Sequence, residues 1–147
     1  MTATPRTGTP VTATPRFDLI GIVVSDMAAS VAFYRRLGLV FAEGADDQPH
    51  VEAELAGGLR FALDREDTVR SFHPDWLPPT SGGRIGLAFL CESGPDVDAR
   101  YAELTDAGYK GVLAPFDAFW GQRYATVEDP DGNGVDLFAP LEATDRQ

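Results

Sequence analysis

Residues 120–138 (WGQRYATVEDPDGNGVDLF) are the stretch that decides the fold. Residues 123–128 and 134–139 have the short, apolar-rich composition of β-strands. Between them, Asp129-Pro130 ends the first strand, and Asp131-Gly132-Asn133-Gly134 supplies residues that tolerate the backbone angles of a tight turn. The stretch therefore predicts two strands joined by a hairpin loop, which is information about the fold and not about chemistry.

The same order of elements is predicted twice along the chain. Tyr34-x-x-Leu37 in one helix matches Tyr101-x-x-Leu104 in another. We therefore predict an α+β fold of two tandem βαβββ modules, with an unduplicated α+β sandwich as the alternative. The first module is expected to have a strand at 17–24, a helix at 27–37 and strands near 39–43, 50–55 and 59–64. The second is expected to have a strand at 85–91, a helix that Ser93 opens and Gly108 ends, and strands near 111–114, 123–128 and 134–139.

One domain is predicted over residues 17–140, with modules at about 17–66 and 84–140 and a linker at about 67–83. Residues 1–16, rich in Thr, Pro and Ala, are predicted to be a disordered N-terminal tail, and residues 141–147 a C-terminal tail. The motif TATPR occurs at 2–6 and again at 12–16. A natural start near Val11 would therefore place residues 1–10 outside the protein.

Composition excludes several classes of partner. The chain has 147 residues and a formal net charge of −11. Nucleic acids and anionic membranes attract clustered Lys and Arg, whereas this chain has one lysine, Lys110, and scattered arginines. No apolar run is long enough to span a membrane, and no signal peptide is recognisable. The single cysteine, Cys91, fits a cytoplasmic location, and the acidic surface either confers solubility or attracts a cationic small molecule.

Alternation along the strands predicts two faces for each sheet. In the last strand, Val135 and Leu137 are expected to face the helix, which leaves Asp136 and Phe138 on the other side. A helix covers one face of such a sheet, so the opposite face must be covered or line a cavity. The corresponding residues of the first and fifth strands are Leu19, Gly21, Val23, Gly86 and Ala88, and several are small enough to leave room for a ligand.

Two blocks of sequence carry a resemblance to a known family. The first is residues 22–27 (IVVSDM) followed by 33–39 (FYRRLGL), and the second is residues 120–124 (WGQRY) followed by 129–133 (DPDGN) and 135–138 (VDLF). Over about residues 17–140, the chain resembles the glyoxalase/bleomycin resistance protein/dioxygenase superfamily, also named for its vicinal oxygen chelate fold. The resemblance implies that the two modules form a cup-shaped mixed sheet.

Metal-dependent members of this superfamily bind a divalent ion through His, Glu or Gln side chains in the cup. The positions that resemble those ligands hold Leu19, Gly86, Asp136 and Phe61. A firm site needs three or four ligands, and neither of the two histidines lies in a spaced metal motif. We therefore expect no metal, no cofactor and no catalytic residue set. Asp136 is the one candidate general base, and a lyase, isomerase or dioxygenase of the same fold is the alternative.

Binding is the function that remains. The resemblance points to the metal-free, drug-sequestering members, which are small, acidic and typically dimeric with clefts shared between chains. We expect a homodimer that binds an aromatic or cationic antibiotic-like compound; a dimerisation or carrier module without a ligand is a third possibility. Asp136 would be either a counter-charge for the ligand or a partner of Arg123. The expected ligand-contacting residues are Trp120, Phe119, Phe41, Phe61, Trp76, Arg123, Tyr124, Asp136 and Phe138, where Phe41 and Phe61 are equally compatible with the core.

Overall fold

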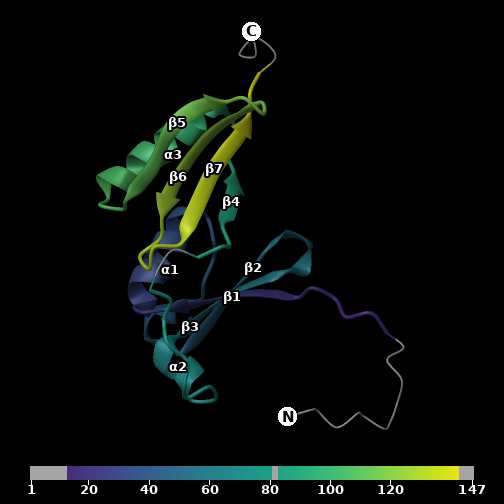
Figure 1. Ribbon diagram of the computed structural model, residues 1–147, viewed down its shortest axis with the longest axis vertical. Coiled ribbons are helices and arrows are strands. Elements are labelled where there is room, and N and C mark those ends of the chain that lie inside the picture. The colour runs from purple at the N-terminus through teal and green to yellow at the C-terminus, as the bar shows by residue number, and fades with distance from the viewer. Residues whose placement is uncertain (1–12, 81–82, 143–147) are drawn as a thin grey trace.

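The computed structural model describes residues 13–80 and 83–142. It is elongated, with one sheet toward each end and α1 between them (Figure 1). The first sheet has the order β1-β3-β2, from β1 (Leu19–Val24), β2 (His50–Glu54) and β3 (Arg60–Arg65). The second has the order β4-β7-β6-β5, from β4 (Leu87–Leu90), β5 (Gly111–Ala118), β6 (Gln122–Glu128) and β7 (Gly134–Pro140). The predicted α+β fold class is confirmed.

Both sheets are mixed, because one pair of strands in each is parallel. β1 runs parallel to β3, and β4 runs parallel to β7, while the other neighbours are antiparallel. A long helix follows each of the two leading strands, α1 (Met27–Arg36) after β1 and α3 (Gly94–Asp106) after β4. The remaining helical segments are the short α2 (Glu66–Arg70) and the 3-10 turns η1 (Ala45–Asp47) and η2 (Ala56–Gly58).

The predicted strand at 39–43 does not form. Instead, the chain passes from α1 through an irregular segment into η1. The guanidinium of Arg35 donates to the carbonyl oxygens of Phe41 at 3.3 Å and Ala42 at 3.0 Å, so it takes up acceptors that a neighbouring strand would need. Gly44 then turns the chain with a positive φ of 80°. The first module is therefore shorter by one strand than the second.

Two capped helices begin where the sequence indicates. The Asp26 side chain accepts a hydrogen bond from the backbone N–H of Ala29 at 3.1 Å, and the Ser93 hydroxyl accepts from that of Asp96 at 3.2 Å. Such side chains satisfy amide groups that have no partner within the first turn. In the predicted linker, the Arg70 guanidinium at the end of α2 lies over the ring of Trp76, 5.2 Å from its centroid.

Parts of the predicted tails and linker, namely residues 1–12, 81–82 and 143–147, lie outside the described residues. Within the rest of the chain, every helix is too short or too polar to cross a lipid bilayer.

The predicted sidedness of the strands is confirmed in the second sheet. Val135, Leu137 and Ala139 of β7 are fully buried on the side covered by α3, while Asp136 and Phe138 alternate onto the other side. In the first sheet, Phe61, which the sequence leaves equally compatible with ligand contact and with the core, belongs to the core. Phe61 points to the helix side and lies 4.9 Å from the ring of Tyr34 on α1, with 2% of its surface exposed. A one-residue change of register is enough to reverse every side chain of a strand.

A buried hydrogen bond joins the two halves. The hydroxyl of Tyr34, on α1, donates to Asp129 Oδ2 at 2.6 Å, in the turn between β6 and β7. Asp129 is 4% exposed and also accepts from the backbone N–H groups of Asp131 and Asn133, both at 2.9 Å, and from the Asn133 amide at 2.8 Å. Nearby, the hydroxyl of Ser25 donates to Asp131 at 2.5 Å. The first module therefore holds the hairpin turn of the second.

A ladder of charges covers the side of the first sheet that faces away from α1. The ring of His50 lies between Asp64, at 2.6 Å from Nδ1, and Glu52, at 2.8 Å from Nε2. Arg60 continues the ladder by donating to Glu52 at 2.8 Å and to Asp18 at 2.6 Å. Both ring nitrogens can donate to carboxylates only when the imidazole is protonated. Hydrogen bonds to Glu52 and Asp64 accordingly raise the pKa of His50.

The first prediction concerns the bond between the halves. Tyr34→Phe should lower the free energy of unfolding by about 1.5–3 kcal/mol, the usual contribution of a hydrogen bond to a charged group. Urea denaturation measures this change. Tyr101→Phe is the matched control and should cost less than about 1 kcal/mol, because the Tyr101 hydroxyl has no hydrogen-bond partner within the described residues. Equal losses in the two variants would contradict this assignment.

The second prediction concerns pH. Because the folded-state pKa of His50 is raised, its stabilising contribution is complete below the unfolded value of about 6.5 and is lost as pH rises through the folded value. His50→Gln should therefore reduce stability at pH 6 and have a smaller effect at pH 8.5. Denaturation curves at several pH values test this, with His73→Gln as the control, since His73 forms no side-chain ion pair in the described part of the chain. A pH-independent loss would refute the ladder's role.

Candidate ligand-binding site

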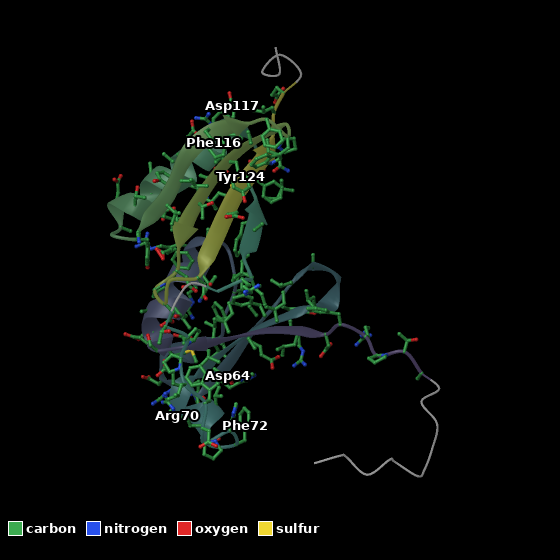
Figure 2. The ribbon with its side chains drawn as sticks, in the orientation of Figure 1. Asp64, Arg70, Phe72, Phe116, Asp117 and Tyr124 are labelled. Carbon is green, nitrogen blue, oxygen red and sulfur yellow. The ribbon has the colours of Figure 1, made fainter. Side chains whose placement is uncertain are left out.

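Among the elements of residues 13–80 and 83–142, no helix lies over the side of the second sheet that faces away from α3. Register places Ala88 beside Asp136, Leu90 beside Phe138, and Tyr124 between Phe116 and Phe138. Figure 2 shows Phe116 and Tyr124 together toward the upper end of this sheet. We call this surface the open face; its residues are Ala88, Leu90, Leu113, Phe116, Tyr124, Thr126, Asp136 and Phe138.

An aromatic corner, formed by Phe116, Phe119, Trp120 and Tyr124, stands at one end of the open face. The ring of Trp120 lies 5.2 Å from that of Tyr124, 5.1 Å from that of Phe119 and 6.2 Å from that of Phe116, all edge to face. Gly121, with a φ of 94°, closes the turn that carries Phe119 and Trp120. Phe119 is 96% exposed and Trp120 49% exposed, so the sheet does not bury the corner.

The indole of Trp120 is held by a specific hydrogen bond. Its Nε1–H donates to Gln122 Oε1 at 2.8 Å. Gln122 is the first residue of β6 and pairs with both Ala118 and Pro140, so its position is fixed by the sheet. The bond therefore adds a directional contact to the three ring contacts that orient Trp120.

Asp136 lies in the middle of the open face. The hydroxyl of Tyr124 donates to Asp136 Oδ2, and the hydroxyl of Thr126 donates to Oδ1 at 2.8 Å. Burial and the hydrogen bond to Asp136 raise the pKa of Tyr124 to about 12, so the phenol stays a neutral donor. Among the described residues, no Arg, Lys or His forms an ion pair with Asp136. The carboxylate is therefore oriented by two neutral groups and not neutralised.

Arg123 does not belong to this site. It alternates onto the α3 side of β6, where Nε donates to Asp98 at 2.9 Å and a terminal nitrogen donates to Asp117 at 3.0 Å. The alternative in which Arg123 pairs with Asp136 is therefore wrong. Hydrogen bonds to the two aspartates raise the pKa of Arg123, which keeps it a fixed cation on the opposite face.

Three other predicted residues lie elsewhere. Phe41 and Phe61 are 6% and 2% exposed and belong to the core, so they are corrected to core residues. Trp76 packs on Arg70, and Arg70 lies at the end of the molecule opposite Tyr124 (Figure 2). The structure therefore brings together Trp120, Phe119, Tyr124, Asp136 and Phe138, and it adds Phe116, Thr126, Leu90 and Leu113.

Thr126 could have been found from the sequence, because it lies two residues after Tyr124 in the same strand and so shares its face. Leu90 has the same spacing from Ala88. Leu113 could not be placed in this way. The register of β5 shifts between Gly111 and Leu113 and again before Phe116.

The residues at the metal positions do not fit a metal ion. Asp136 is the only one of them with a ligating side chain, and its two oxygens bind hydroxyls. In β3, the residues beside Phe61 on the other face are Arg60 and Ala62, of which neither is a metal ligand. Residues 13–80 and 83–142 contain no group of three His, Cys, Asp or Glu side chains arranged to hold one ion.

A depression of about 330 Å³ exists elsewhere, along the outer edge of β2. It is lined by small apolar residues and by polar ones, including Ala45, Glu43, His50 and Glu52. His50 and Glu52 are already engaged in the charge ladder, and none of the residues that line the depression is a Phe, Tyr or Trp. The open face, by contrast, carries the exposed side chains of Leu90, Leu113 and Phe116.

Comparisons with known proteins agree with this architecture. Residues 16–137 match the sequence profile of the glyoxalase/bleomycin resistance protein/dioxygenase superfamily. An uncharacterised protein of Mycobacterium bovis is 32% identical over 127 residues, which cover 82% of this chain and 80% of that protein.

Solved structures give the same result. A member of this superfamily from Nocardioides is 26% identical, with a TM-score of 0.69 over 90% of this chain and 89% of the other. A family enzyme from Burkholderia phytofirmans is 20% identical, with a TM-score of 0.74 over 86% of this chain and 100% of the other, a likeness of fold. The chain belongs to the glyoxalase/bleomycin resistance protein/dioxygenase superfamily.

Proposed function

We propose that the protein binds a small planar, antibiotic-like molecule on the open face and sequesters it by affinity, as the metal-free drug-resistance members of the superfamily do. The observation that carries the proposal is the aromatic corner. Trp120 is half exposed, is held in orientation by Gln122, and is one tyrosine away from the Asp136 carboxylate. Planar ligands need this combination of aromatic surface and few polar anchors.

The energetics require a second wall. Binding at about 1 µM needs about 8 kcal/mol, whereas stacking on one aromatic ring contributes about 1–3 kcal/mol. The open face is the surface of a single sheet, so it can contact only one side of a flat ligand. A site of useful affinity therefore needs another surface opposite Trp120.

A second copy of the chain supplies that wall in our proposal. Several large apolar side chains around the open face are uncovered, among them Leu90 at 68% exposure, Leu113 and Phe119. β1 and β4 are both edge strands that do not pair with each other within the described residues. In a homodimer that covers this surface, the open face would become one wall of a cleft shared between two chains.

A lyase, isomerase or dioxygenase is the second candidate. The observation in its favour is the hydrogen-bonded pair of Tyr124 and Asp136, which could hold and move a proton at the Asp136 carboxylate. Metal analysis of the purified protein separates the candidates. A tightly bound metal in stoichiometric amount would favour the enzyme and overturn the sequestering role.

Calorimetric titration with bleomycin and with planar drugs tests the binding proposal. Trp120→Ala should weaken binding about 5- to 150-fold, because a stacking contact of about 1–3 kcal/mol is lost. Trp76→Phe is the matched control and should change affinity by less than about twofold, since Trp76 lies at the other end of the molecule. The proposal fails if no planar compound binds, or if the two substitutions weaken binding equally.

The dimer gives a separate prediction. Light scattering of the protein at micromolar concentration should give about twice the chain mass of 15.8 kDa. The double variant Leu90→Glu and Leu113→Glu should shift the protein to the monomer, because it places charges in the covered surface. The matched control is Val40→Glu, at a residue that is 81% exposed on the segment after α1. If the wild-type protein scatters as a monomer and still binds a planar ligand, the shared cleft is excluded.

A further inference from the structure

We infer that the open face selects a planar ligand that carries a positive charge, such as a protonated aromatic amine, and that Asp136 is the residue that recognises the charge. This inference rests on the proposed function and specifies its ligand class. Two hydrogen bonds hold the Asp136 carboxylate, and among the described residues no cation pairs with it.

The two hydroxyl donors orient the carboxylate but do not use all of its hydrogen-bond acceptor positions. Tyr124 donates to one oxygen and Thr126 to the other. A carboxylate can accept about four hydrogen bonds, so each oxygen keeps a free acceptor position. Both donors are neutral, and the raised pKa of Tyr124 keeps it protonated. The negative charge therefore remains available on an otherwise apolar surface.

Within residues 13–80 and 83–142, no protein cation pairs with this charge. Arg123, on the same strand as Tyr124, is directed to the other face, where Asp98 and Asp117 engage it. Lys110, near the far end of the sheet, contacts Glu128 at 3.3 Å. Within the described residues, Asp136 has only the two hydroxyl partners. A half-buried carboxylate without a cationic partner is costly, so a cationic ligand that pairs with Asp136 is stabilised there.

The aromatic corner adds to the same preference. Tyr124 connects the two features, because its hydroxyl contacts Asp136 while its ring lies 5.2 Å from Trp120 and 6.0 Å from Phe116. Aromatic faces attract cations, and the carboxylate repels anions. A ligand whose flat part stacks on Trp120 would place a nearby amine at Asp136. A neutral planar ligand would gain the stacking only.

A pair of probes with one ring system tests the inference. At pH 7.5, 9-aminoacridine is a cation, whereas acridine is neutral. A hydrogen bond to a charged group contributes about 1.5–3 kcal/mol, so the cation should bind at least about tenfold more tightly by calorimetric titration. This preference should shrink as sodium chloride is raised, a measurement that needs no variant.

Asp136→Asn keeps the size and the acceptor oxygen but removes the charge. It should bring the affinities of the two probes to within about threefold of each other while leaving acridine binding nearly unchanged. Asp117→Asn is the matched control. It removes the same charge from the opposite face of the sheet, and the preference for the cation should persist.

The outcomes separate the two proposals. Equal binding of both probes by the wild type, or a cation preference that survives both Asp136→Asn and high salt, would overturn the role of Asp136 and leave the binding function standing. If neither probe nor any planar drug binds, the proposed function fails and the ligand class fails with it. The expected result is that the wild type and Asp117→Asn bind the cation more tightly than acridine, whereas Asp136→Asn does not.

Discussion

The hydrogen bond from Tyr34 to Asp129 is the contact on which the arrangement of the molecule depends. Asp129 is a buried carboxylate with four donors, of which three belong to its own turn and one comes from α1. Those donors satisfy a charge that would otherwise be expensive to bury. The turn that they shape sets the register of β6 against β7, and that register places Tyr124 and Thr126 on either side of Asp136.

The open face therefore has two levels of support. Buried valine, leucine and alanine side chains of β6 and β7 pack under α3 and fix the sheet. The alternate residues of the same strands are left to face outward. On β6, for example, the Arg123 side chain lies on the side covered by α3 and the Tyr124 side chain lies on the open face. Because side chains alternate along the strands, the paired charges of Arg123, Asp98 and Asp117 lie on one face of the sheet. The carboxylate of Asp136, which has no cationic partner among the described residues, lies on the other.

Much of this architecture is predictable from the sequence, because it depends on local patterns. Caps, turn residues and alternation locate the two long helices α1 and α3, the hairpin at residues 129–134 and the outward position of Asp136. The failures come from side chains that reach across sequence. Arg35 captures the carbonyls of Phe41 and Ala42, so an apolar segment with strand composition becomes a loop. The partners of Arg123 include Asp98 on α3, which no spacing rule identifies.

The outer surfaces of the two sheets differ in character. The outer surface of the first sheet is an ion ladder from Asp18 through Arg60 and Glu52 to His50 and Asp64, and that of the second is largely aromatic and aliphatic. The two sheets therefore present one charged and one largely apolar outer surface. Added salt screens the first surface but does not weaken the second, so ionic strength should change how the two surfaces compete for contacts in a concentrated solution.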